Sequence, residues 1–228
     1  MTNSSAEPGA TDASIECGGG RFTLTPEHAA FCESTRSLLV ADTHLGKSEA
    51  FRASGVPVPA GDADEQLERL SGVIARTGAE RVVVIGDLLH APAGLSEGLI
   101  ERVRAWRTRE PIELNIVPGN HDRRLDRVVD AWRLRVRDEG WGEGPFTCWH
   151  DPADVPRHPF AFAWSGHVHP VVVLRSGPDR LRLPAYIVGE DRAVLPAFSR
   201  FTGGVSPPAS LGSARYAIAG RSVVRVPD

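Results

Sequence analysis

The sequence lacks several features that would place the protein in a special class. No apolar run approaches the roughly 18 residues that a membrane-spanning helix needs, so we expect no membrane association. The first twenty residues have neither an apolar segment nor a basic start, unlike a signal peptide. Only three cysteines are present, Cys17, Cys32 and Cys148, with no CxxC spacing. This usage argues against a zinc ribbon and is typical of a reducing compartment, which predicts a cytoplasmic protein.

Excess charge is also missing, because 26 basic and 29 acidic side chains leave a formal net charge of −3. That value is too small to indicate a polyanionic partner by itself. Lysine is almost absent, since Lys47 is the only one and every other basic residue is an arginine. The remaining composition, 41% hydrophobic and 24% charged, is that of an ordinary globular protein that buries a core without disulfide bonds.

Apolar runs and amphipathic stretches alternate along most of the chain. Residues 1–20 are small, polar and rich in glycine, and we predict a disordered tail there. No long linker divides residues 21–228, which predicts one α/β domain. Short apolar runs after residue 134 predict a β-rich second half, antiparallel in part. The first half follows a βαβαβ order that favours parallel strands, with strands at Ser37–Ala41, Arg81–Gly86 and Ile112–Val117 and helices at Gly61–Thr77 and Ser96–Thr108.

Acidic, amide and imidazole side chains follow the ends of five predicted strands. Because the carboxyl ends of strands line the ligand crevice of an α/β sheet, we expect these side chains to converge. Five of the eight histidines stand at such positions. The set comprises Asp42, His44, Asp87, Asn120, His121, His150, His167 and His169.

These side chains offer oxygen and nitrogen ligands without any thiolate. Such ligands suit Mn²⁺, Fe or Zn²⁺ better than Ca²⁺ or Cu(I). Seven of these side chains, all except His121, are too many ligands for one tetrahedral zinc and fit two ions that share a carboxylate. Two metals so placed clamp the attacking and leaving oxygens of a phosphoryl displacement.

The order and spacing of these residues are similar to the five-motif signature of the calcineurin-like metallophosphoesterases. The motifs are Asp42-x-His44, Gly86-Asp87, Gly119-Asn120-His121-Asp122, His150 and Gly166-His167-x-His169. A narrower resemblance, to the bacterial ligase-associated DNA damage response endonucleases of the PdeM type, rests on DTHLGKSEAFRASGVPVP (Asp42–Pro59), GDLLHAPAG (Gly86–Gly94) and LRLPAYIVGEDRAVLPAFSRFTGG (Leu181–Gly204). The resemblance implies a β-sandwich flanked by helices in αββα layers.

The resemblance also implies a role for each residue of the motifs. His121 would act as general acid while a metal-bridging hydroxide attacks phosphorus. His158 is the alternative to His150 in the fourth motif, but it ends no apolar run. The implied ligands are Asp42, His44 and His169 for one metal, Asp87 as the bridge, and Asn120, His150 and His167 for the other metal.

By the same resemblance, we expect a binuclear-metal-dependent phosphodiesterase that acts as an endonuclease on single-stranded DNA in ligase-associated DNA repair. Its cofactors would be two divalent ions, Mn²⁺ in preference to Fe or Zn²⁺. An ATP-dependent DNA ligase and a helicase would be its functional partners. Two alternatives stay open. The same centre would serve a small diester or pyrophosphate, such as a nucleotide-sugar lipid or a cyclic nucleotide, or the fold would be a non-catalytic scaffold.

Several polar residues near the motifs have two interpretations. Arg123 and Arg124 follow the third motif directly and are the arginines that we expect nearest to a substrate phosphate. His90 would either reach the substrate or lie behind it as a supporting side chain. Lys47 would either contact a phosphate or lie in solvent. For the other arginines we favour an ordinary ion-paired surface, because acidic residues lie close to them in the sequence.

Overall fold

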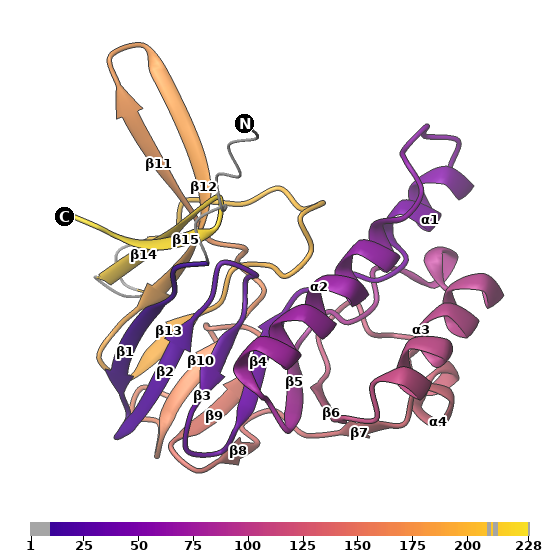
Figure 1. The fold of residues 1–228 in the computed structure, drawn as a ribbon, viewed down its shortest axis with the longest axis horizontal. Coiled ribbons are helices and arrows are strands. Elements are labelled where there is room, and N and C mark those ends of the chain that lie inside the picture. The colour runs from indigo at the N-terminus through magenta and orange to yellow at the C-terminus, as the bar shows by residue number, and fades with distance from the viewer. Residues whose placement is uncertain (1–9, 209–210, 212–213, 228) are drawn as a thin grey trace, which may run out of the picture.

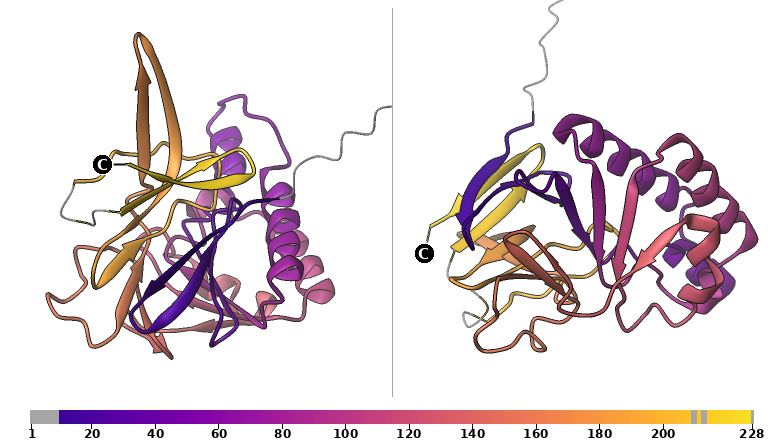
Figure 2. Two further views of the ribbon diagram at one scale, coloured as in Figure 1. Left: turned by 60° about the vertical axis from the view of Figure 1, so that its left-hand side comes forward. Right: turned by 90° about the horizontal axis from the view of Figure 1, so that it is seen from below.

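A computed structural model describes residues 10–208, 211 and 214–227 of the chain. In this part of the chain, two β-sheets pack face to face and a group of helices lies against one of them (Figures 1 and 2). The predicted α/β sandwich is therefore confirmed. None of the helices in the described residues is long and apolar enough to cross a membrane.

In the first sheet, seven strands follow one another in chain order. The first four strands are joined antiparallel, whereas the fourth to the seventh run parallel. They are β1 (Ala13–Cys17), β2 (Gly20–Leu24), β3 (Ala30–Cys32), β4 (Ser37–Ala41), β5 (Arg81–Ile85), β6 (Glu113–Val117) and β7 (Leu134–Val136).

The second sheet combines parallel and antiparallel pairs, as the sequence predicts. Its members are β8 (Gly142–Glu143), β9 (Phe146–Trp149), β10 (Phe162–Ser165), β11 (Val171–Ser176), β12 (Asp179–Val188), β13 (Arg192–Val194), β14 (Ala214–Ala219) and β15 (Ser222–Val226). Strand β10 runs parallel to β9 and β13, and the other pairs are antiparallel. The β11–β12 hairpin projects from the body of the molecule (Figure 1).

The helices connect the parallel strands of the first sheet. They are α1 (Lys47–Ala53), α2 (Asp62–Thr77), α3 (Glu97–Arg109) and α4 (Val129–Trp132), with short 3₁₀ turns η1 (Pro92–Gly94) and η2 (Leu125–Arg127). The βαβαβ pattern predicted β4, α2, β5, α3 and β6 with each bound correct to within one residue. Helix α3 begins where the Ser96 hydroxyl accepts a hydrogen bond from the Leu99 amide (3.2 Å), which satisfies an otherwise unpaired donor.

Two large apolar cores hold the layers together. Leu67, Leu70 and Val73 of α2 recur at helical spacing and pack with α3 on the outer face of the first sheet. Phe22 and Trp164 belong to the second core, between the two sheets. The αββα order would put a second helical layer outside the second sheet. The described residues instead place a small apolar cluster on part of that sheet, and α2, α3 and α4 pack on the first sheet only (Figure 2).

The N-terminal part of the chain requires a correction. Residues 13–17, which the sequence prediction placed in a disordered tail, form β1 and pair with β2. Ile15 is buried in the core between the sheets, and Thr11 exchanges backbone hydrogen bonds with Arg221 and Val223. The sandwich therefore begins before residue 21. Residues 1–9, the rest of the predicted tail, lie outside the described residues.

Candidate metal centre

The loops that follow five strands meet at one end of the sandwich and bring the predicted residues together. Asp42 follows β4, Asp87 follows β5, and Asn120 follows β6. From the second sheet, His150 follows β9, and His167 and His169 follow β10. The centre is thus built by both sheets, as expected for side chains at the carboxyl ends of strands.

A first ligand group contains Asp42, His44 and His169, whose ligand atoms lie within 4.8 Å of one another. The Nε2 atoms of His44 and His169 are 3.3 Å apart, and His169 Nε2 lies 3.7 Å from Asp42 Oδ2. Asp42 and His44 are buried. Both sheets contribute to this group, since His169 comes from the second sheet.

A second group contains Asp87, His150 and His167, again within 4.8 Å of one another. His150 Nε2 lies 3.0 Å from His167 Nδ1 and 2.9 Å from the side-chain oxygen of Asn120. Asn120 and His167 are exposed, so this side of the centre opens to solvent. His158, the alternative for the fourth motif, belongs to neither of these groups.

Asp87 lies between the two groups. Its Oδ2 is 3.9 Å from His44 Nε2, and its Oδ1 is 3.7 Å from His150 Nε2. Each carboxylate oxygen therefore faces a different group. The Oδ1 atom also accepts a hydrogen bond from the His121 amide (2.9 Å), which fixes the orientation of the carboxylate.

The donor atoms fit divalent cations. Asp42 Oδ1 is buried without a hydrogen-bond partner in the described part of the chain. His169 Nδ1 lies 3.3 Å from the carbonyl oxygen of Gly203, so a neutral ring that donates there presents its Nε2 lone pair to Asp42. Buried carboxylates with imidazole nitrogens turned toward them form the type of site that holds Mn²⁺, Fe or Zn²⁺.

The backbone at the centre adopts an uncommon conformation. Five of the residues in these groups have left-handed φ angles: Asp42 (53°), His44 (47°), Asp87 (45°), His167 (64°) and His169 (49°). Such angles are sparsely populated for residues with a Cβ atom, and they concentrate at functional sites. They turn the chain sharply at the end of each strand, so that the ligands point into the shared space.

Comparison with solved structures identifies the family. The crystal structure of the Pseudomonas putida nuclease MPE matches this chain with a TM-score of 0.81 and 33% sequence identity, covering 95% of this chain and 100% of that one. The chain belongs to the metallophosphoesterase superfamily. The E. coli phosphoesterase Yfce matches more distantly, with a TM-score of 0.46, 18% identity and coverage of 83% and 97%. No family model and no curated protein matched the sequence.

Glycines make room for the candidate ligands of this metallophosphoesterase. A Cβ atom on Gly86 would lie 1.8 Å from His150 Nδ1, and one on Gly119 would lie 2.3 Å from Asp87 Oδ1. A Cβ on Gly166 would approach Asp42 Oδ2 to 2.8 Å. The glycine of each motif therefore permits close approach of its backbone to a ligand from another strand.

Asp122 is a supporting residue that sequence reasoning did not assign a role. Its buried carboxylate accepts backbone hydrogen bonds from Gly119 (2.8 Å), Leu89 (2.8 Å) and Leu88 (3.3 Å). These bonds tie the loop after β6 to the loop after β5. Burial raises the pKa of Asp122, whereas the three amide donors oppose that rise. The signal in the sequence was its place at the end of the Gly-Asn-His-Asp motif.

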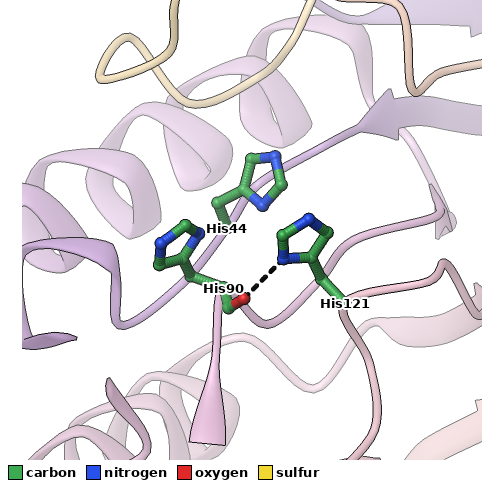
Figure 3. A group of neighbouring side chains, drawn as sticks. All are labelled: His44, His90 and His121. Atoms are coloured by element: carbon green, nitrogen blue, oxygen red, sulfur yellow. Dashed lines mark hydrogen bonds between the residues drawn. The ribbon is translucent and has the colours of Figure 1, made fainter. Parts of the chain in front are cut away.

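His121 lies next to His90 and His44 (Figure 3), and one ring nitrogen of each lies within 4.8 Å of the others, so these residues form a third candidate group that shares His44 with the first. Its Nδ1 lies 2.7 Å from the backbone oxygen of His90, so a ring that donates there keeps Nε2 for another partner. The rings of His90 and His121 stack, with centroids 5.6 Å apart and planes 15° apart. His90 thus supports His121 through both its backbone and its ring.

Burial controls the electrostatics of the first ligand group. It lowers the pKa of His44 to about 2, an effect that the neighbouring His169 and Lys47 reinforce, so His44 is neutral and ready to ligate. Burial raises the pKa of Asp42 against the effect of His169. Burial opposes protonation of His169, but its contact with Asp42 raises the His169 pKa overall.

The mouth of the centre contains one of the two predicted substrate arginines. Arg123 lines a cavity of about 320 Å³ with Asn120, His121 and His90. Arg124 is exposed and lies 3.9 Å from Asp126. Several other surface arginines, such as Arg104 with Glu101 (3.3 Å), have carboxylate partners. Of the arginine pair, only Arg123 lines this cavity in the described part of the chain.

Proposed function

We propose that the protein is a binuclear-metal phosphodiesterase that cleaves single-stranded DNA. The observation that carries the proposal is the position of Asp87, whose two oxygens face two separate ligand groups. The likeness to a nuclease over 95% of the chain supports a nucleic-acid substrate. The finer expectations, an endonuclease that works with an ATP-dependent ligase and a helicase in cytoplasmic DNA repair, rest on the resemblance of three sequence segments.

The side chains suggest which residues bind the metal ions and which act on the substrate. Two divalent cations, Mn²⁺ by preference, would lower the pKa of water and offset the charge of the phosphate. We assign their binding to the seven residues Asp42, His44, Asp87, Asn120, His150, His167 and His169.

His121 has a different role in the proposal. Its Nδ1 is turned to the His90 carbonyl, so Nε2 would donate a proton to the leaving alkoxide as general acid. Arg123, at the mouth, would contact a substrate phosphate, as Arg124 would from the adjoining surface. None of these roles requires His121, Arg123 or Arg124 to bind a metal.

Two other functions were open from the sequence. A scaffold without catalysis has no need for buried ligand groups, and the predicted ligands all lie together, which disfavours that reading. A small diester or pyrophosphate as the substrate uses the same centre. A direct assay of both substrates distinguishes this alternative from cleavage of DNA.

The test uses metal-depleted protein supplied with Mn²⁺. We expect about two ions bound per chain, hydrolysis of bis-p-nitrophenyl phosphate, and cleavage of circular single-stranded DNA. Asp87→Ala should lose metal and both activities, whereas the exposed carboxylate variant Asp130→Ala should keep them. Unchanged hydrolysis in Asp87→Ala would contradict the binuclear mechanism. Hydrolysis of the small diester with intact DNA would contradict the nucleic-acid substrate.

A further inference from the structure

A row of rings leads away from the metal centre. His90 stacks on His121, and the ring of Phe51 also stacks on His90, with centroids 6.1 Å apart and planes 20° apart. Phe51 in turn meets the ring of Phe201 edge to face at 5.5 Å. The Lys47 ammonium lies 5.5 Å from the Phe201 ring centroid. We call Lys47, Phe51 and Phe201 the aromatic–lysine patch.

The patch is built from segments distant in the sequence. Lys47 and Phe51 belong to α1, in the segment 42–59, and Phe201 belongs to the segment 181–204. His90, in the segment 86–94, joins the patch to the centre. The three segments on which the narrower resemblance rests, 42–59, 86–94 and 181–204, therefore meet here. None of the patch residues is among the assigned metal ligands.

Lys47 is held differently from the arginines that pair with carboxylates, such as Arg104 with Glu101. No carboxylate lies within ion-pair distance of its ammonium in the part of the chain that the structure describes. Its side chain is partly buried, which lowers the pKa of Lys47, whereas the charge of Asp62, beyond ion-pair distance, raises it. Lys47 in turn lies close enough to His44 and His90 for its charge to lower the pKa of both. A cation held without a carboxylate beside a phosphoesterase centre is available to a phosphate oxygen.

Phe201 offers ring surface to a ligand. Its side chain is 40% exposed despite the contacts with Lys47 and Phe51. It borders a cavity of about 410 Å³ whose exposed lining is mostly apolar, with Val58 and Pro59 among its walls and Asp62, Glu65 and Arg200 at its polar side. This volume lies in the range of small-molecule sites. The apolar walls and the aromatic ring suit a flat, hydrophobic group such as a nucleobase.

We propose that the aromatic–lysine patch binds a nucleotide adjacent to the scissile phosphate, with the base stacked on Phe201 and a phosphate on Lys47. Proteins that bind single strands combine cations on the backbone with aromatic rings under the bases. The patch brings both together next to His90, whose ring stacks on that of His121. The inference rests on the proposed function, and it assigns Phe201 and Lys47 as positioning residues rather than catalytic ones.

The test compares substrates that differ only in the base. The p-nitrophenyl esters of thymidine 5′-phosphate and thymidine 3′-phosphate are each paired with the abasic deoxyribose analogue, so that the leaving group is constant. In the wild type, the base should raise kcat/KM about 5- to 150-fold on one side of the phosphate, the range given by stacking of one base. Phe201→Ala should lose most of this base effect, and Phe201→Trp should retain it.

The control and the contradicting results are distinct. Phe160→Ala removes an aromatic ring that is 84% exposed and precedes the far end of β10, and it should leave the base effect as in the wild type. An equal base effect in wild type and Phe201→Ala, or no base effect in either, would overturn the inference. Failure of the wild type to cleave DNA or either thymidine ester, with bis-p-nitrophenyl phosphate still hydrolysed, would overturn the proposed function as well.

Lys47 is tested by the salt dependence of oligonucleotide cleavage. Removing a side chain that neutralises one phosphate should reduce the slope of log KM against log salt concentration by about 0.7 for a single strand. We expect this reduction for Lys47→Gln and not for Arg104→Gln, whose guanidinium is exposed on α3 and pairs with Glu101. Equal slopes in Lys47→Gln and wild type would remove Lys47 from the proposal.

Discussion

A single methyl group at residue 119 would reach two of the side chains that meet between the ligand groups. Its carbon would lie 2.3 Å from Asp87 Oδ1 and 2.8 Å from the His150 ring. Both side chains are buried and packed, so neither can move freely. We predict that Gly119→Ala weakens Mn²⁺ binding at least about 10-fold, as for a displaced ligand support. Titration calorimetry of the metal-depleted protein measures this.

Gly72 provides the matched control for Gly119. It lies inside α2, and a Cβ there would meet nothing within 4 Å. Gly72→Ala should therefore leave Mn²⁺ affinity unchanged and stabilise the protein by about 0.5–1 kcal/mol, because alanine favours the helix. Equal Mn²⁺ affinities for the two variants would show that the space at Gly119 is not needed.

The loss of rate on replacing His121 should be larger for a substrate with a poorer leaving group. Loss of a general acid costs about 10²–10⁴-fold when the departing alkoxide needs a proton. p-Nitrophenolate departs without one. We predict that His121→Gln reduces DNA cleavage about 10²–10⁴-fold, as expected for a lost proton transfer. This loss should be at least about ten times larger than the loss of bis-p-nitrophenyl phosphate hydrolysis in the same variant. Equal losses on both substrates would assign His121 to binding alone.

At the scale of the elements, His28 joins the β2–β3 turn to the segment after β13. Its Nδ1 lies 2.7 Å from the Ala197 carbonyl oxygen, and the side chain is buried. Burial lowers the pKa of His28 to about 4, with Arg69 and Arg200 adding to the effect. The unfolded chain has an ordinary histidine pKa near 6.5 and binds a proton more readily. Stability is therefore lost as the pH falls from about 6.5 towards 4.

The size of this loss can be measured on metal-depleted protein. His28 should account for about 1 kcal/mol of the decrease in unfolding free energy between pH 7 and pH 5.5. Asparagine tolerates the left-handed backbone at this position, where φ is 70°. Urea unfolding of His28→Asn should show a pH dependence smaller by that amount, unlike His158→Asn at an exposed histidine. The same pH slope in His28→Asn and wild type would contradict the prediction.

The elements that the sequence predicted are those with a period or a continuous apolar run. Leu67, Leu70 and Val73 repeat at helical spacing and predicted α2, whereas β4 is apolar at most of its positions. The sequence pattern did not predict β1, because Ile15 is its one fully apolar buried side chain. The pairing of β1 with β2 appears only in the folded chain. Helix α1 is short and begins at a left-handed Gly46 without a side-chain cap.

The candidate site was more predictable than the fold around it. The motif residues are ordered along the chain, and strand ends converge for topological reasons, so Asp42 and Asp87 were expected near His150. Phe51 and Phe201 carry no such signal. Their contact joins a helix to a loop about 150 residues later, and only the folded chain shows it.

At the scale of the whole molecule, the metal centre connects the two sheets. Asp42 and Asp87 belong to loops of the first sheet, whereas His150 and His169 belong to the second. Cations bound to ligands from both sheets favour the folded state, by about 2.7 kcal/mol when the free ion is a hundredfold above its Kd. We predict that chelation lowers Tm by several degrees, on the order of 2–4 °C per kcal/mol.

Calorimetry with and without chelator measures the change, and added Mn²⁺ should restore it. Asp87→Ala should show a much smaller difference between the two conditions, because its centre binds less metal. A Tm that is the same with and without chelator would mean that the sheets are held together by their apolar core alone.

The left-handed backbone at Asp42, His44, Asp87, His167 and His169 has a consequence for how fast the centre fills. These turns follow strands that are buried in the apolar cores, so the fold itself holds their backbone, whereas the centre opens to solvent at Asn120 and His167. Little ordering of the polypeptide is left for the ion to cause, so capture is limited by diffusion and by stripping water from the ion. The rate at which one metal replaces another is then set by dissociation of the bound ion. A centre that holds the wrong ion therefore exchanges it no faster than that ion dissociates.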